Sequence, residues 1–186
     1  MKVIILSGKS GSGKDMTAYF MKEHLEALNK KVIIIHYADA VKWILKDFFA
    51  WDGQKDEHGR HLLQYIGTDV VRTNFPNYWV DIVAKLLAAL QTVDNFDVAI
   101  IPDARFENEI EVTMRYLPDA CCVRIERQNA DGTPWINPQL TEEQQKHPSE
   151  TSLDHYTFDY IIHNDEGLEL LKESAYTLLQ DLGVIE

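Results

Sequence analysis

A glycine-rich segment between a short apolar run and a helix-compatible stretch constrains the fold of this chain most. Residues 8–15 read GKSGSGKD and fit the spacing G-x-x-x-x-G-K, with Asp15 where serine or threonine is usual. The apolar run VIIL lies before the segment, and residues 16–29 favour a helix after it. Glycines let backbone N–H groups turn toward a polyphosphate, and the helix start adds the positive end of its dipole. The segment therefore predicts a phosphate-binding loop in which Lys14 reaches the β- and γ-phosphates; a flexible turn containing glycine and lysine is the alternative.

Length and charge bound the class of protein. The 186 residues suffice for one domain, 1–186, with a substantial core. The net charge of -12 argues against a general affinity for nucleic acid or anionic membranes, although a local cluster of Lys and Arg can still bind a small anion. No apolar stretch approaches the ~20 residues of a membrane helix. Strand-like residues begin at position 3, so we expect no signal peptide.

The two cysteines, Cys121 and Cys122, are adjacent. Neighbouring residues of a strand point to opposite faces, which suits a core strand better than a disulfide between them. Without a disulfide framework or an export signal, we expect a cytoplasmic protein.

Five β-rich runs alternate with helix-compatible stretches. The expected strands are 3–6, 32–36, 98–101, 121–125 and 160–163. The expected helices are 16–29, 39–49, 60–74, 78–93, 106–116 and 166–182. The strands are nearly continuous in apolar residues, as strands covered on both faces are. The pattern predicts an α/β fold with a five-stranded parallel sheet, helices on both faces, and ligands at the carboxyl ends of the strands.

Two regions depart from this alternation. Residues 39–94 place three helical patterns between the second and third strands, more than a crossover needs, and we expect part of them to form a substrate-covering lobe. Residues 126–155 are polar, contain three prolines and show no clear periodicity. So long a loop in a compact domain is usually functional, so we expect a mobile lid, with a plain surface loop as the alternative.

Charged residues follow the strands that border the predicted loop. Asp103 comes directly after the strand 98–101 and Pro102, and Arg105 follows two residues later. Asp103 can hold Mg²⁺ through water or accept a proton, and Arg105 can stabilise charge in a transition state. The alternative for Asp103 is to cap the helix that starts near Arg105. For Asp15 three possibilities stay open. Asp15 is a direct Mg²⁺ ligand, or Thr17 is the ligand instead, or the charge of Asp15 simply favours the helix N-terminus.

Polar side chains recur at four-residue spacing on one face of the predicted helix 60–74. They are Arg60, Gln64, Thr68 and Arg72. The arginines can grip a phosphate, and the Gln64 amide can read a base edge because it both donates and accepts. Spacing alone favours a solvated helix face.

Further residues are candidates for holding the molecule that would accept a phosphoryl group. Asp39 and Lys42 begin the predicted helix 39–49, where helix capping and surface exposure explain them equally well. Trp79, Trp43 and Trp51 can stack on a base, although tryptophan more often packs in a core. No paired zinc-ligand spacing occurs, so we expect no structural metal.

Short motifs follow one another along the chain: SG and GKD within 7–15, YADAVK at 37–42, LQYIGTD at 63–69, NYWV at 77–80, IPDAR at 101–105, and SE at 149–150 followed by IHND at 162–165. Through them the chain resembles the deoxynucleoside monophosphate kinases of bacteriophages. The resemblance implies a P-loop kinase fold with an inserted helical substrate-binding lobe and a lid. It implies transfer of the γ-phosphoryl group of ATP, with Mg²⁺, to a deoxynucleoside 5′-monophosphate, in a host cytoplasm and with a homodimer as an option.

The resemblance also implies roles for individual residues. ATP would bind Gly8, Ser10, Gly11, Ser12, Gly13, Lys14, Asp15, Arg124 and Arg127. The acceptor would lie near Asp39, Lys42, Arg60, Gln64, Thr68, Arg72 and Trp79. Lys14, Asp103 and Arg105 would act at the point of transfer, with Mg²⁺ at Asp15 and Asp103. The competing hypotheses are another small-molecule kinase, such as a dephospho-coenzyme A or phosphomevalonate kinase, and a regulatory or assembly NTPase.

Overall fold

A computed structural model of the chain describes residues 1–54, 56–93, 96–129 and 131–185. The predicted domain 1–186, insertion 39–94 and lid 126–155 each include positions outside these ranges. The core of the structure is one parallel sheet in the order β2-β3-β1-β4-β5. The strands are β1 (Lys2–Ser7), β2 (Val32–Ile34), β3 (Val98–Ala104), β4 (Cys121–Glu126) and β5 (Tyr160–His163). The predicted five-stranded parallel sheet is thus confirmed.

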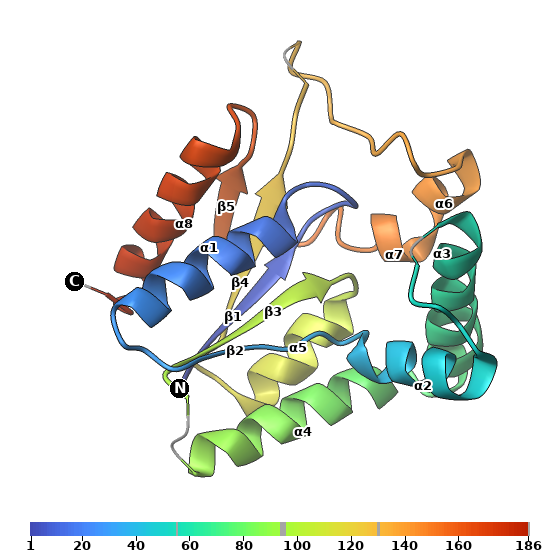
Figure 1. Cartoon of the computed structure of the whole chain (residues 1–186), viewed down its shortest axis with the longest axis horizontal. Coiled ribbons are helices and arrows are strands. Elements are labelled where there is room, and N and C mark those ends of the chain that lie inside the picture. Colours follow the sequence, from blue (N-terminus) through green and yellow to red (C-terminus); the bar gives the residue numbers. More distant parts are fainter. Residues whose placement is uncertain (55, 94–95, 130, 186) are drawn as a thin grey trace.

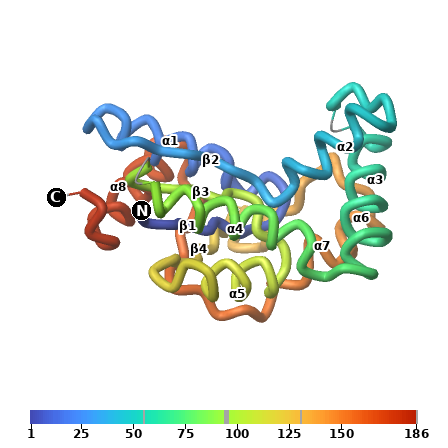
Figure 2. The backbone as a smooth tube through the Cα atoms, turned by 90° about the horizontal axis from the view of Figure 1, so that it is seen from below, coloured from blue at the N-terminus to red at the C-terminus, as the bar shows by residue number. Residues whose placement is uncertain are grey.

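Helices cover both faces of this sheet (Figures 1 and 2). The helices α1 (Lys14–Ala27) and α8 (Leu168–Asp181) pack side by side on one face, and α4 (Tyr78–Thr92) and α5 (Glu107–Tyr116) cover the other. No helix in the described part of the chain has the length and apolar composition that a membrane span requires.

The apolar runs predicted as strands supply two cores. In β1, Ile4 belongs to the core beneath α1 and α8, and its neighbour Ile5 belongs to the core beneath α4 and α5. Cys121 and Cys122 divide between the same two cores, and both are buried free thiols. Burial raises the pKa of Cys121 to about 12 and that of Cys122 to about 11, so both stay protonated as apolar packing residues.

A separate group of helices lies beyond the carboxyl ends of the strands, at the right of Figure 1. It contains α2 (Asp39–Phe49), α3 (Glu57–Gln64) and the π-helical segment η1 (Tyr65–Arg72). The short helices α6 (Glu142–Lys146) and α7 (Pro148–Thr151) lie beside them. Its own small core is made of Val41, Leu45, Trp51 and Trp79. Trp79 lies in the first turn of α4, whose next residues pack on the sheet, so this helix joins the group to the sheet.

Three expected elements differ in detail. The predicted helix 60–74 is an α-helix only as far as Gln64 and is π-helical from Tyr65 to Arg72. The predicted strand 32–36 ends at Ile34, since the His36 amide donates to the Asp39 carboxylate at 2.9 Å and turns the chain away from β3. The segment 126–155 contains α6 and α7; the first is capped by the Thr141 hydroxyl, which accepts from the Gln144 amide.

Candidate functional site

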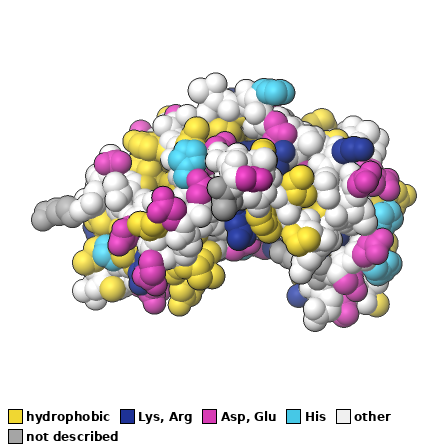
Figure 3. Space-filling view, turned by 90° about the horizontal axis from the view of Figure 1, so that it is seen from above, with side chains coloured by type: hydrophobic (Ala, Val, Ile, Leu, Met, Phe, Trp, Pro, Cys, Tyr) yellow, Lys and Arg dark blue, Asp and Glu magenta, His cyan; other side chains and the backbone are white. Residues whose placement is uncertain are grey.

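A cleft of about 260 Å³ lies at the carboxyl ends of β1 and β3, between the sheet and the helical group. Figure 3 shows the surface hollowed between the body that holds the sheet and the smaller body beside it. The cationic side chains that line the cleft are Lys14, His36, Lys42, Arg60, Arg72 and Arg105. The acidic ones are Asp15, Asp103 and Glu109. The cleft is therefore cationic although the whole chain carries a net charge of -12, so it suits an anionic ligand.

Most residues predicted for the site meet in this cleft. Those that line it are Ser10, Gly11, Lys14, Asp15, Lys42, Arg60, Gln64, Thr68, Arg72, Trp79, Asp103 and Arg105. The predicted residues outside its lining are Gly8, Ser12, Gly13, Asp39, Arg124 and Arg127.

The glycine loop takes the form that its sequence predicts. It joins β1 to α1, which begins at Lys14 after Gly13 in a left-handed conformation. Gly8 has φ 150, and a Cβ there would lie 2.4 Å from the Ile125 carbonyl oxygen. Only glycine fits so close to β4 at this backbone angle.

Lys14 lies folded into the loop. Its Nζ donates to the carbonyl oxygens of Gly8 at 2.6 Å and Lys9 at 2.8 Å. Burial, together with the nearby Arg105 guanidinium, holds the pKa of Lys14 well below its usual range. A phosphate beside this ammonium would relieve both effects, because an opposite charge favours the protonated form.

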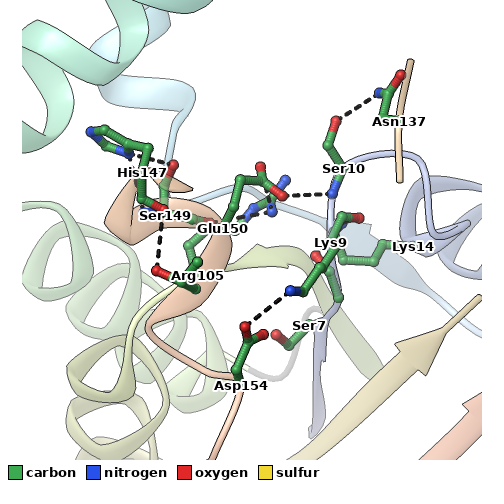
Figure 4. Close-up of polar contacts among 12 residues, drawn as sticks. Ser7, Lys9, Ser10, Lys14, Arg105, Asn137, His147, Ser149, Glu150 and Asp154 are labelled. Carbon is green, nitrogen blue, oxygen red and sulfur yellow. Dashed lines mark hydrogen bonds and ion pairs between the residues drawn. The ribbon is translucent and has the colours of Figure 1, made fainter. Parts of the chain in front are cut away.

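Glu150 of α7 reaches the same loop (Figure 4). One carboxylate oxygen accepts from the Ser10 amide at 2.8 Å, and the other accepts from Arg105 Nη1 at 2.9 Å. The carboxylate is thus held as a phosphate oxygen is held at such sites, by a loop N–H and a guanidinium. Glu150 stands where a phosphate group of a ligand would find its donors.

The rest of the segment 126–155, which the sequence predicts as a lid and which is called the lid segment below, also contacts the loop. Asn137 Nδ2 donates to Ser10 Oγ at 3.0 Å, and Arg127 Nη1 donates to the Gly11 carbonyl at 3.2 Å. Asp154 accepts from Lys9 at 2.9 Å and from Arg124 at 3.3 Å. Arg124, which lies within β4 rather than in the lid segment, is therefore held against Asp154 and Ser7 in this arrangement.

Asp103, at the end of β3, holds the entry to α2. Its two oxygens accept from the Tyr37 amide at 2.9 Å and the Ala38 amide at 3.0 Å. The alternative in which Asp103 caps the helix near Arg105 is wrong. Glu109 instead accepts from the amides of Arg105 and Phe106 at that helix start.

His36 joins the two carboxylates at the mouth of the loop. Its ring nitrogens lie 3.8 Å from Asp15 and 3.3 Å from Asp39. Burial alone would lower the pKa of His36, but these carboxylates raise it to about 9. Asp39 also accepts from Lys42 at 2.9 Å, and the His36 and Lys42 contacts outweigh burial to lower the pKa of Asp39. His36 thus adds a positive charge to the cleft.

The polar row of α3 and η1 forms the opposite wall. Arg60 donates to the Gln139 side chain at 3.0 Å, which ties α3 to the lid segment. Arg72 pairs with Glu109, donates to Asn108 at 2.9 Å and lies 3.9 Å from the centre of the Phe106 ring. Burial raises the pKa of Glu109 to about 7, and Arg72 opposes that shift.

Carboxylate oxygens are available for a hard cation. Asp15 and Asp103 both line the cleft, and one or two carboxylates with substrate phosphates and water form the usual Mg²⁺ environment. Among the described residues, no group of three or more His, Cys, Asp and Glu side chains could hold a metal by itself. The donor set fits a metal that arrives with a phosphate ligand.

The sequence does not point to His36, Glu109 or Glu150 as site residues. Glu109 stands three residues after Phe106, where a glutamate often accepts from the first amides of a helix, so its spacing was a usable signal. The Glu150 contact with Ser10 spans 140 positions, and no local pattern reveals it.

Comparisons with known proteins concern the family and the fold. The family model of deoxynucleotide monophosphate kinase matches residues 47–175. No curated protein sequence matches the chain. A sugar kinase from Janibacter sp. HTCC2649 superposes with a TM-score of 0.54 at 15% identity, over 100% of this chain and 98% of that one. The tunicamycin resistance protein of Deinococcus radiodurans gives 0.52 at 14% identity, over 99% and 96%. A hexameric APS kinase from Thiobacillus denitrificans gives 0.53 at 10% identity, over 100% of this chain and 30% of that one. At such identities the likeness shows a shared fold.

We predict that Glu109 makes stability fall between about pH 5 and pH 7. Its folded pKa of about 7 lies above the ordinary value of 4.5, so the folded chain binds the proton more tightly than the unfolded chain does. The free energy of unfolding should therefore drop by about 1–3 kcal/mol as pH rises through this window. Urea unfolding of the wild type and Glu109→Gln at pH 5 and pH 8 measures the change. Glu109→Gln should lack this drop, whereas Glu107→Gln, an exposed change in the same helix, should keep it. An equal drop in the free energy of unfolding in all three proteins would contradict the prediction.

We also predict that Glu150→Gln tightens the binding of a polyphosphate to this loop. The amide still accepts from Ser10 but removes the negative charge beside the phosphate donors, so affinity should rise by about tenfold. Calorimetric titration with Mg²⁺·ATP measures it. Glu142→Gln makes the same charge change on an exposed part of the lid segment and should bind as the wild type does. Unchanged or weaker binding by Glu150→Gln would count against Glu150 as a competitor of phosphate.

Proposed function

The chain belongs to the deoxynucleotide monophosphate kinase family, and from that premise we propose that it transfers the γ-phosphoryl group of ATP to the 5′-phosphate of a deoxynucleoside monophosphate. One observation carries the proposal most: a single cleft has phosphate donors on both walls. Lys14 and the loop amides lie on one wall, and Arg60 and Arg72 lie on the other. Two phosphate-bearing ligands can therefore meet head to head between them.

The loop wall would bind ATP. The Ser10 amide and Lys14 Nζ are hydrogen-bond donors whose present acceptors are a side chain and loop carbonyls, and phosphate oxygens can replace both. Asp15 and Asp103 would hold Mg²⁺, which when bound neutralises charge on the phosphates.

The helical wall would bind the acceptor. Arg72 lines this wall and is held in place by Glu109 and Asn108, so its guanidinium would lie beside an anion bound there. Gln64 and Thr68 lie between the two arginines of the row and line the same cleft. Their side chains can donate and accept hydrogen bonds, as recognition of a base or sugar requires. Lys42, from the start of α2, adds a further cation on this side.

Arg105 lines the same cleft and binds the Glu150 carboxylate beside the loop. In the proposed reaction an oxygen of the acceptor phosphate bonds to the γ-phosphorus while the bond from that phosphorus to the β,γ-bridging oxygen breaks. ADP leaves and a deoxynucleoside diphosphate forms. The role of the protein is to orient the reactants and neutralise charge, and Arg105 can stabilise the moving phosphoryl group.

The lid segment can exclude water from this reaction. It contacts the loop through Asn137 and Glu150, and it contacts α3 through Gln139. One segment thus bridges the two walls, as a lid that closes over bound substrates must do.

The test of the proposed function is an ADP-release assay with Mg²⁺·ATP and a panel of deoxynucleoside and ribonucleoside monophosphates, with dephospho-coenzyme A and phosphomevalonate as further acceptors. Turnover that depends on a deoxynucleoside monophosphate supports the proposal. Turnover only with dephospho-coenzyme A or phosphomevalonate would support a kinase but contradict the proposed nucleotide acceptor. Turnover that needs no acceptor would indicate a regulatory NTPase instead.

We predict that Arg105→Ala lowers kcat by roughly 10²–10³-fold, as losing one charge-stabilising donor often does. Steady-state kinetics at saturating ATP and acceptor measure this loss. Arg115→Ala, an exposed change near the end of α5, serves as the matched control and should keep the wild-type rate. A near-wild-type kcat for Arg105→Ala would remove this residue from the transfer step.

A further inference from the structure

The polar row on the helical wall changes helix type halfway along. Arg60 and Gln64 lie in the α-helix α3, whereas Thr68 and Arg72 lie in the π-helical η1. The backbone shows the change directly, since the Thr73 amide donates to the carbonyl of Thr68, five residues earlier. Segments of this kind are rare and often mark functional sites.

This change keeps the row on one side. In an α-helix four residues exceed a full turn by about 40°, so a row at four-residue spacing drifts steadily around the helix. A π-helix has a wider turn, in which four residues fall short of a full turn, so the drift reverses. The step from Arg60 to Gln64 drifts one way, and the steps to Thr68 and Arg72 drift back. All four side chains line the cleft, as this compensation requires.

One side chain from another helix bonds to the middle of the π-helical segment. Trp79 of α4 is 3% exposed, and its Nε1 donates to the Gly67 carbonyl at 2.8 Å. The indole N–H is a donor only, so this bond fixes where the carbonyl must lie. The Trp79 ring is held in turn by the small core it shares with Val41 and Leu45.

A second set of contacts holds the end of the segment. The Asn74 side chain donates to the Val70 carbonyl at 2.6 Å, and Arg72 is bound to Glu109. In α3 the side-chain contact lies at the helix start, where Asp56 accepts from the Gly59 amide at 2.8 Å, and the turns that follow are α-helical. The Trp79 bond therefore lies at the point where the geometry departs from an α-helix.

We propose that Trp79 is a positioning residue, whose hydrogen bond to Gly67 holds residues 65–72 in π-helical form and so aims Thr68 and Arg72 at the ligand of the cleft. Trp79 then acts through the row rather than by stacking on a base. The identity of that ligand as a deoxynucleoside monophosphate rests on the proposed function. The effect of Trp79 on the backbone geometry of residues 65–72 does not rest on the proposed function.

Trp79→Phe tests the inference, since it keeps an aromatic ring and removes the N–H. The KM for the acceptor should rise by about tenfold, while kcat and the KM for ATP stay within about twofold, because only the acceptor wall loses its alignment. Trp51→Phe is the matched control. Trp51 shares the same small core and also loses an indole bond, to the Gln54 carbonyl at 3.0 Å, but it does not line the cleft. An unchanged acceptor KM in Trp79→Phe, or an equal rise in Trp51→Phe, overturns the inference.

Double-mutant cycles separate alignment from general destabilisation. Thr68→Val removes a polar group on the π-helical part of the row, and Gln64→Ala removes one on the α-helical part. In the Trp79→Phe background, Thr68→Val should cost little further affinity for the acceptor, whereas Gln64→Ala should cost as much as in the wild type. Full additivity of both pairs contradicts the proposed role.

Hydrogen exchange gives a readout that does not depend on catalysis. In Trp79→Phe the amides of residues 65–73 should exchange faster than in the wild type, with those of α8 unchanged; equal exchange in 65–73 overturns the inference. If no deoxynucleoside monophosphate supports turnover by the wild type, the proposed function fails. The exchange data still decide the role of Trp79.

Discussion

Hydrogen-bond donors and positive charges converge on the loop after β1, and they require an oxyanion. The Ser10 amide and Arg105 both donate to the Glu150 carboxylate, and Lys14 is buried in the same loop, where it donates to two loop carbonyls. Desolvated charges of like sign are stable together only when an opposite charge lies between them. The Glu150 carboxylate supplies that charge in the present arrangement. Because Glu150 belongs to the lid segment, the electrostatics of the loop also decide where this segment lies.

Charge compensation also shapes the opposite wall of the cleft. Arg72 enters the cleft because Glu109 compensates its charge, and Glu109 also caps the start of α5. One buried carboxylate therefore links the helical wall of the cleft to the strand end that carries Asp103 and Arg105. The π-helical geometry of η1 and the Trp79 bond add the alignment that charge alone does not give.

Local sequence patterns predicted the parallel sheet and the loop. For the polar row, spacing alone favoured a solvated helix face, and only the family resemblance implied that it lies near a ligand. Apolar runs such as 98–101 become strands because both sheet faces are buried, and the glycine spacing dictates the turn before Lys14. What these patterns could not predict depends on contacts between distant residues. The π-helix looks like an ordinary amphipathic helix in the sequence, since the Trp79 bond that accompanies it comes from another element. The Asp103 contacts with Tyr37 and Ala38 likewise depend on how β3 meets the turn after β2.

In the proposed reaction one cleft brings two phosphate chains end to end. The most direct measurement is calorimetric titration with bisubstrate analogues, in which adenosine and a deoxynucleoside are joined through five phosphates. We expect one analogue to bind per chain. For at least one base its affinity should exceed that of ATP by about 10²-fold or more, because the second half then binds at a high effective concentration (roughly mM for short linkers). If the analogues of all bases bind no more tightly than ATP, the two phosphate sites do not lie end to end in one cleft.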